Sequence, residues 1–249
     1  MSKPVTALGL CLGASTISFV QLRRNGHGDR HCLLDHKIYP HDGNPKKTLI
    51  AALQKVDWKT IDKVAATGRK FRRFLNLSAI PEPEAVEIAY GYIKPADRNC
   101  PAIISAGGET FMVYMLDASG RITNVLTGNK CAAGTGEFFL QQLRRMDVSL
   151  ETAGKWDDDT EPYAVSGRCS VFCKSDCTHA TNKGIPRARV TAGLGRMMAN
   201  KILELLKKVE RRDLMLVGGA AQNQMMVRNL RNAIPGLIIP SEAPYFEAL

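Results

Sequence analysis

The fold is decided by LGLCLGASTISFVQL at residues 8–22 and by IISAGGETFMVYML at residues 103–116. Each stretch is typical of a β-strand, a tight turn that contains glycine, and a second β-strand. A further strand, a helix and another strand are expected after each of them. The chain therefore contains an internal repeat of architecture rather than of residues.

Apolar spacing predicts the elements of both halves and the boundary between them. The first half is expected to contain strands at 5–10, 17–22, 33–39 and 64–66 and a helix at 45–56. The second is expected to contain strands at 102–104, 111–116, 122–126, 214–217 and 237–239 and helices at 137–146 and 190–209. The polar segment 94–101, which contains two prolines, predicts one domain over residues 1–97 and a second over 98–249.

Composition narrows the class of protein. Of the 249 residues, 45% are hydrophobic and 23% are charged, which is typical of a soluble globular protein and excludes a disordered chain. The net charge of +10 favours an anionic partner such as a nucleotide, coenzyme A, a nucleic acid or an acidic protein. The seven scattered cysteines indicate a reducing, cytoplasmic compartment. Neither a membrane-spanning run nor a nucleic-acid-binding module is recognisable, so neither partner is expected.

Four glycine turns at strand ends indicate a phosphate-binding protein. They are Gly13–Thr16, Gly107–Thr110, Gly134–Gly136 and Gly218–Gly219. Glycine lets the backbone approach a ligand closely, and its N–H groups can point at phosphate oxygens. Gly134–Gly136 also opens a helix, whose N-terminus attracts anions. Any one of the turns could be a plain hairpin, but four in two repeated units favour nucleotide binding.

Three longer motifs carry a family resemblance: GNKCAAGTG at 128–136, SGRCSVF at 166–172 and VGGAAQN at 217–223. With the two phosphate turns they resemble the sugar kinase, Hsp70 and actin superfamily. Within it they are most similar to the ATP-dependent activators of 2-hydroxyacyl-CoA dehydratases and to the related benzoyl-CoA reductase ATPases, the BadF/BadG/BcrA/BcrD-like family. The resemblance implies an actin-like α/β fold, with two RNase H-like domains and a nucleotide cleft between them.

The resemblance also implies cofactors and partners. Each subunit of a homodimer would give Cys131 and Cys169 to one shared [4Fe–4S] cluster. ATP-driven closure would let the protein pass one electron, received from ferredoxin or flavodoxin, to an acyl-CoA dehydratase or reductase component. The glycine turns and the implied adenosine site together give the expected ATP/ADP-binding residues: Gly13, Ala14, Ser15, Thr16, Gly107, Gly108, Glu109, Gly134, Thr135, Gly136, Gly218, Gly219, Gln222 and Asn223.

The sequence departs from the family at two aspartates that organise Mg²⁺ around the γ-phosphate. Cys11 and Ser105 stand at these positions, and neither is a hard anionic ligand. Glu109, inside the second turn, is the expected catalytic replacement, whereas Asp117 lies across a strand from that turn. Binding through backbone N–H groups does not need either aspartate. An alternative function is therefore a nucleotide sensor or scaffold that does not hydrolyse ATP. A third hypothesis is a small-molecule kinase, which would need a carboxylate base near the γ-phosphate, where the two aspartates are missing.

The other cysteines and the histidines have less specific roles. Cys173 and Cys177 follow Cys169 at helical spacing and are either small buried residues or ligands of an altered or second cluster. The isolated cysteines are expected to be packing residues: Cys11, Cys32 and Cys100. Four histidines are expected at the surface: His27, His31, His36 and His41. Residues 244–249 resemble the start of a final helix, so the chain is expected to be one piece of a longer polypeptide.

Overall fold

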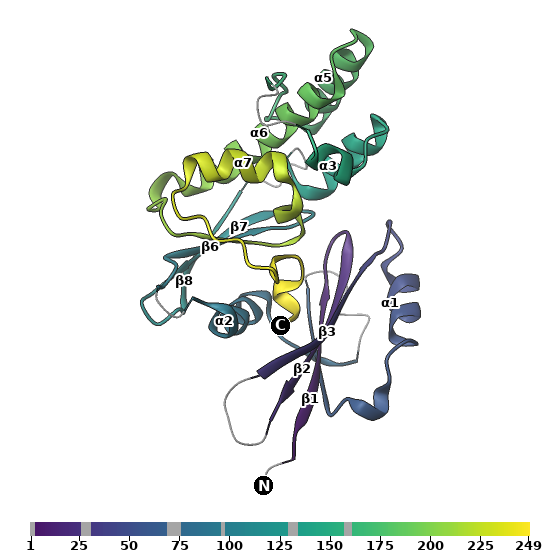
Figure 1. Cartoon of the computed structure of the whole chain (residues 1–249), viewed down its shortest axis with the longest axis vertical. Helices are drawn as coiled ribbons and strands as arrows, with labels where there is room; N and C mark the ends of the chain where they lie inside the picture. The colour runs from purple at the N-terminus through teal and green to yellow at the C-terminus, as the bar shows by residue number, and fades with distance from the viewer. Residues whose placement is uncertain (1–2, 26–30, 69–75, 96–97, 129–133, 157–160) are drawn as a thin grey trace. The chain divides into compact units, whose positions relative to one another are not determined.

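A computed structural model describes residues 3–25, 31–68, 76–95, 98–128, 134–156 and 161–249 (Figure 1). The chain divides into two compact units. Unit 1 comprises residues 1–98 and 245–249, and unit 2 comprises residues 99–244. None of the helices in the described residues is long and apolar enough to cross a membrane.

Unit 1 is built on a five-stranded sheet in the order β3-β2-β1-β4-β5. Its strands are β1 (Val5–Leu12), β2 (Thr16–Arg24), β3 (His31–Pro40), β4 (Lys63–Thr67) and β5 (Ser78–Ala79). Strands β1, β2 and β3 are antiparallel, whereas β4 runs parallel to β1. The helix α1 (Pro45–Leu53) lies between β3 and β4 in the chain, which confirms the predicted strand-strand-strand-helix-strand order.

The alternation of side chains along β1 places its leucines and its remaining residues on opposite faces of the sheet. Leu8, Leu10 and Leu12 pack in a core with Leu49 of α1, and Figure 1 shows this helix beside the strands. The helix begins where Asn44 Oδ1 accepts a hydrogen bond from the N–H of Lys47 at 3.2 Å. A second helix, α2 (Glu82–Ile93), was not among the predicted elements.

Unit 2 repeats the antiparallel part of this arrangement in a four-stranded sheet of order β8-β7-β6-β9. Its strands are β6 (Ala102–Ala106), β7 (Phe111–Leu116), β8 (Ile122–Thr127) and β9 (Met215–Val217), of which β9 runs parallel to β6. The strand expected at 237–239 is reduced to a single bridge between Met215 and Ile238. Pro235 and Pro240 flank this segment and lack the N–H that a longer ladder needs.

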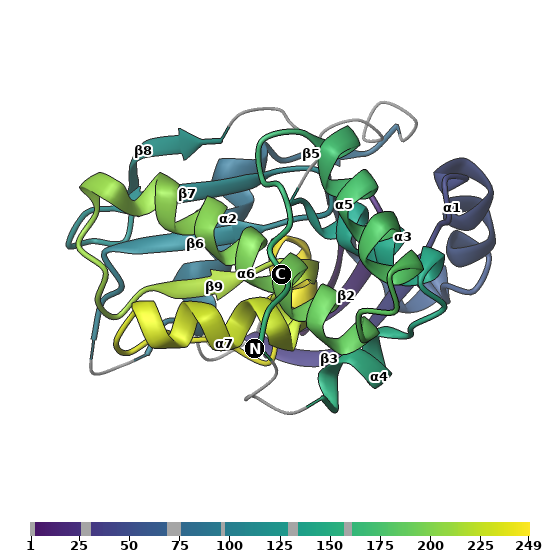
Figure 2. The ribbon, with the colours of Figure 1, turned by 90° about the horizontal axis from the view of Figure 1, so that it is seen from above.

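The helices of unit 2 are α3 (Gly136–Arg145), α4 (Leu150–Gly154), α5 (Ser170–Asn182), α6 (Arg187–Leu205) and α7 (Gln224–Ala233). In Figure 2, α6 and α7 lie side by side along the sheet. Short 3-10 turns occur at η1 (Trp58–Thr60), η3 (Leu206–Lys208), η4 (Gly219–Gln222) and η5 (Ala243–Ala248). The helix predicted at 190–209 is therefore α6 followed by η3, and it begins earlier, directly after Pro186.

Candidate functional site

The first glycine turn connects β1 to β2. The N–H of Gly13 donates to the carbonyl oxygen of Thr16 at 3.0 Å. A Cβ atom on Gly13 would lie 3.0 Å from the same oxygen, so a side chain there would crowd the turn. The sequence therefore uses glycine at this position because two backbone segments come into close contact.

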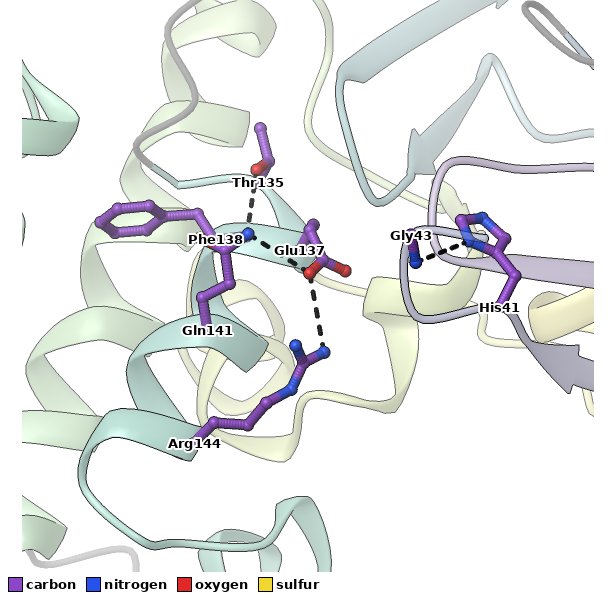
Figure 3. A network of polar contacts seen from close by, with 7 residues as sticks. All are labelled: His41, Gly43, Thr135, Glu137, Phe138, Gln141 and Arg144. Carbon is purple, nitrogen blue, oxygen red and sulfur yellow. Dashed lines mark hydrogen bonds and ion pairs between the residues drawn. The ribbon is translucent and has the colours of Figure 1, made fainter. Parts of the chain in front are cut away.

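The side chain of His41 contacts this turn. The prediction that His41 lies at the surface is wrong. Its side chain is 6% exposed. Nε2 lies 3.4 Å from the carbonyl oxygen of Gly13, and Nδ1 accepts a hydrogen bond from the N–H of Gly43 (Figure 3). In a neutral ring the proton is then on Nε2, which faces the Gly13 carbonyl. His41 thus ties the end of β3 to the first glycine turn.

The second glycine turn, between β6 and β7, has the same geometry. The N–H of Gly107 donates to the carbonyl oxygen of Thr110 at 3.1 Å, and a Cβ atom on Gly107 would lie 3.2 Å from that oxygen. The two predicted turns are therefore equivalent in backbone structure as well as in sequence plan. Glu109 is exposed within the second turn.

The start of α3 packs against the second turn. The N–H groups of Gly136 and Glu137 donate to the carbonyl oxygens of Gly107 and Gly108, at 3.2 and 2.9 Å. The third N–H of the helix, at Phe138, is capped by the hydroxyl of Thr135 at 3.4 Å (Figure 3). The N–H groups of Gly136 and Glu137 therefore join the start of α3 to the second glycine turn. The sequence had suggested instead that the N-terminus of this helix attracts an anion. Phosphate contact by residues 134–136 stays a prediction.

The Glu137 carboxylate lies on the first turn of α3, and the sequence analysis did not single it out. It accepts a hydrogen bond from the Gln141 amide at 3.3 Å and lies 3.6 Å from the Arg144 guanidinium (Figure 3). A carboxylate here is also favourable because the N-terminus of a helix carries a partial positive charge. Its spacing of four residues from the Gln141 amide and seven from the Arg144 guanidinium, which places the three side chains on one side of the helix, is the signal that would have found this network.

The predicted adenosine turn begins at Gly218, directly after β9. Gly218 has a φ of 93°, and its N–H donates to the carbonyl oxygen of Ala243 at 2.7 Å. The Asn223 side chain is buried and caps α7 by accepting from the N–H of Met226 at 3.2 Å. Its Nδ2 atom lies 3.3 Å from the sulfur of Met198. In this structure Asn223 therefore stabilises the helix, whereas Gln222 is exposed.

A pocket of about 530 Å³ lies next to this turn, entirely within unit 2. This volume lies within the range of ordinary small-molecule sites, about 300–1,000 Å³. The residues that line the pocket are Leu150, Glu151, Gly154, Ala221, Gln222, Gln224, Ile239, Pro240, Ser241, Ala243 and Pro244. They combine apolar side chains with amide, hydroxyl and carboxylate groups. Of these residues only Gln222 was predicted to bind the nucleotide, because most of the others come from distant segments of the chain.

The two positions that lack aspartate are both buried at strand ends. Cys11 Sγ donates to Glu247 Oε2 at 3.4 Å. Burial, and then the neighbouring Glu247 carboxylate, raises the pKa of the Cys11 thiol. Ser105 is 4% exposed in the middle of its sheet. Asp117 lies in the β7–β8 turn, where bonds from Ser119 and then from the Arg121 N–H lower the pKa of its carboxyl, so its role is structural.

Cys169 stands directly before α5 and is partly exposed. Val171 and Phe172, in the first turn of α5, are 69% and 64% exposed. Cys173 and Cys177 are buried, as expected for packing residues. A hydrogen bond between the two free thiols raises the pKa of Cys173 and lowers that of Cys177. Cys131 lies outside the described residues.

The isolated cysteines have mixed outcomes. Cys11 and Cys100 are buried as expected, but Cys32 is exposed on β3, so its assignment as a packing residue is wrong. His31 and His36 are exposed as predicted, and His27 lies outside the described part of the chain. Among the described residues, no group of three or more His, Cys, Asp and Glu side chains could hold a metal ion.

Comparison with known proteins identifies the family of this chain. A model of the BadF/BadG/BcrA/BcrD ATPase family matches residues 53–241, which is most of the chain. The chain belongs to this family. The 2-hydroxyisocaproyl-CoA dehydratase activator of Clostridioides difficile is 30% identical over 187 residues, which are 74% of this chain and 69% of that protein. An uncharacterized protein of Methanocaldococcus jannaschii is 25% identical over 199 residues, 78% of this chain and 79% of that protein.

Solved structures confirm the actin-like α/β fold of this BadF/BadG/BcrA/BcrD family member. The 2-hydroxyisocaproyl-CoA dehydratase activator from Clostridium difficile, solved with bound ADPNP, has a TM-score of 0.82 at 24% identity. The similarity covers 98% of this chain and 91% of that one. Component A of the Acidaminococcus fermentans (R)-2-hydroxyglutaryl-CoA dehydratase has a TM-score of 0.79 at 22% identity, over 98% of this chain and 95% of that one.

Proposed function

We propose that this protein is an ATP-dependent iron–sulfur activator that transfers electrons to a 2-hydroxyacyl-CoA dehydratase or to an acyl-CoA reductase component. The observation that carries the proposal is the family match over residues 53–241, which includes all three motifs, two of which contain the proposed cluster ligands. Two named relatives support it: the activator in Clostridioides difficile and the (R)-2-hydroxyglutaryl-CoA dehydratase activating ATPase of Acidaminococcus fermentans, 31% identical over 127 residues.

The nucleotide would be ATP or ADP. We assign residues 1–97 to a first domain and residues 98–249 to a second domain, whose last residues return to the first. The turns Gly13–Thr16 and Gly107–Thr110 would bind the phosphates, because both leave backbone groups at the tip of a hairpin. The adenosine would bind at Gly218, Gly219 and Gln222, beside the pocket of about 530 Å³. Glu109 is the candidate catalytic carboxylate of the second turn.

The cluster would be one [4Fe–4S] centre, held by Cys131 and Cys169 of each subunit in a homodimer. Cys169 fits this role because it is partly exposed and precedes α5, whereas Cys173 and Cys177 are buried and their free thiols interact with each other. Thiolate is the ligand that iron–sulfur clusters use. The exposed Val171 and Phe172 give the surrounding surface the apolar character that a subunit contact needs.

Ferredoxin or flavodoxin would be the electron donor, and a cytoplasmic location would keep the cluster reduced. ATP binding would drive the closing of the nucleotide site, and this closing would in turn allow electron transfer. When bound, the cluster supplies the one-electron chemistry, and this chain's residues hold it and control its exposure.

The test is the iron and acid-labile sulfide content of the full chain after anaerobic purification, with its EPR spectrum after dithionite reduction. About two irons and two sulfides per chain are expected, because one cubane would serve two subunits. Cys131→Ser and Cys169→Ser should lose the cluster and the dimer. Cys32→Ser, at an exposed position in unit 1, is the matched control and should keep both.

Three outcomes would change the proposal. About four irons per chain, lost in Cys173→Ser, would show that the buried pair binds an altered or second cluster. Iron retained in Cys169→Ser would overturn the ligand assignment. Absence of iron even after reconstitution, together with tight ATP binding, would favour the nucleotide sensor or scaffold instead.

A further inference from the structure

The end of β1 contacts a carboxylate that comes from the far end of the chain. Glu247 belongs to residues 245–249, which pack on the sheet face of unit 1 that is turned away from α1. Its Oε2 atom accepts from the thiol of Cys11 at 3.4 Å. Cys11 is two residues before Gly13, so the carboxylate lies beside the strand end that leads into the first phosphate turn.

Contacts on both sides fix Glu247 in this place. Tyr245 stacks on the ring of His36, with 4.2 Å between the centroids and 24° between the planes. Ala248 is 3% exposed, and its carbonyl lies against Gly9, where any Cβ atom would collide with it. Gly9 is therefore the residue that lets the terminal segment lie directly on β1 and bring the carboxylate to Cys11.

A second oxygen atom lies on the same face of the sheet. Thr67 of β4 is the register partner of Cys11 in the parallel pair, and register partners share a face. Its side chain is 3% exposed, and within the described residues Oγ1 has no hydrogen-bond partner. A buried hydroxyl without a partner indicates a water molecule or ligand that completes it.

These two oxygen donors fit a hard cation, whereas the thiol between them does not. Mg²⁺ prefers oxygen ligands and is usually bound by one or two carboxylates together with substrate phosphates. A site of this kind therefore needs few protein ligands.

We propose that Glu247, assisted by the hydroxyl of Thr67, supplies at the first phosphate turn the carboxylate that Cys11 cannot. The carboxylate then comes from residues 245–249 and not from the strand β1. Residues 245–249 therefore belong to the nucleotide site. Glu247 is then a ligand of the magnesium ion that accompanies the nucleotide. The inference rests on the nucleotide binding proposed above but does not depend on the cluster.

The experiment measures ATP affinity of the full chain by calorimetry, with Mg²⁺ and with EDTA. The variants are Glu247→Gln, Thr67→Val and the double variant Cys11→Asp/Glu247→Gln. Glu84→Gln, which removes an exposed carboxylate from α2 of the same unit, is the matched control. Glutamine keeps the bond with the Cys11 thiol, so the fold is expected to survive, and a thermal melt of each variant verifies this.

Glu247→Gln should lose about tenfold in affinity with Mg²⁺ and nothing in EDTA, as expected when one charged ligand is removed. The double variant should regain most of this loss because it returns a carboxylate to the same place. Unchanged magnesium dependence in Glu247→Gln, or no recovery in the double variant, would overturn the inference and leave the proposed function intact. Failure of the unmodified protein to bind ATP would overturn both.

Discussion

Both units contain the same glycine turn between two antiparallel strands, β1–β2 in unit 1 and β6–β7 in unit 2. They differ in the residues of the first strand that come just before the turn. In unit 1 the turn glycine is preceded by Gly9 and Cys11, and the terminal segment lies on them. In unit 2 the corresponding positions are Ile103 and Ser105, both buried. The two turns therefore have the same backbone structure but different side chains beside them. The internal repeat determines the backbone of the turn and does not determine those side chains.

The largest expected effect is at Gly9. Gly9→Ala places a methyl group where the Ala248 carbonyl lies, so the strand and the terminal segment must separate. We expect a loss of about 2–3 kcal/mol of unfolding free energy in urea, the usual cost of overpacking. Gly91→Ala is the matched control, because a Cβ atom on Gly91 meets nothing within 4 Å and alanine favours the α2 helix. Equal stability of the two variants would contradict the packing of residues 245–249 on β1.

The next effect compares the helix caps of the two units. Asn223→Ala should lose about 1–2 kcal/mol, because the buried side chain caps α7, whereas Asn44→Ala, at the exposed start of α1, should lose about 0.5–1 kcal/mol. Asn223→Ser keeps a capping oxygen. If this variant is stable but binds ATP more weakly, Asn223 also contacts adenosine. If it binds ATP normally, its role is structural alone.

Sequence reasoning predicted the repeat because its signals are local. Alternating apolar residues and a glycine at each turn define β1–β2 and β6–β7 without tertiary information. The match between Gly68 and Gly218 was not predicted, although both follow a parallel strand, with φ values of 112° and 93°. A lone glycine after a short strand carries no signal until the carbonyl that it approaches is known.

The candidate site was predictable only in its backbone parts. The three glycine motifs of unit 2 were recognised, and the structure shows that Gly136 contacts Gly107 and Ala220. The contact between Cys11 and Glu247 joins residues at opposite ends of the chain, so no spacing rule could find it. For the same reason the burial of His41, under the turn at Gly13, was missed.

A smaller effect compares the turn glycines themselves. Gly13→Ala and Gly107→Ala place a Cβ atom 3.0 and 3.2 Å from the carbonyl oxygens of Thr16 and Thr110. Each neighbour must shift by a few tenths of an ångström, so we expect losses of about 1 kcal/mol, larger at Gly13. Both variants should weaken ATP binding if both turns contact phosphate. A loss of affinity in one variant alone would show that a single turn carries the phosphates.

The smallest effect is the response of the two strand ends to pH. Since burial and Glu247 raise the pKa of Cys11 in the folded chain, the unfolded chain loses the thiol proton first. The stabilising contribution is therefore complete below the unfolded thiol pKa of about 8.5 and decreases as the pH rises above it. At pH 9 the loss should be about 0.8 kcal/mol, and it should be absent in Cys11→Ser. Hydrogen exchange at β1 and β6 measures this loss. The strand β6 is the reference, because Ser105, at the position that corresponds to Cys11, does not titrate. Equal pH dependence of the two strands in the unmodified protein would contradict the assignment of the effect to Cys11.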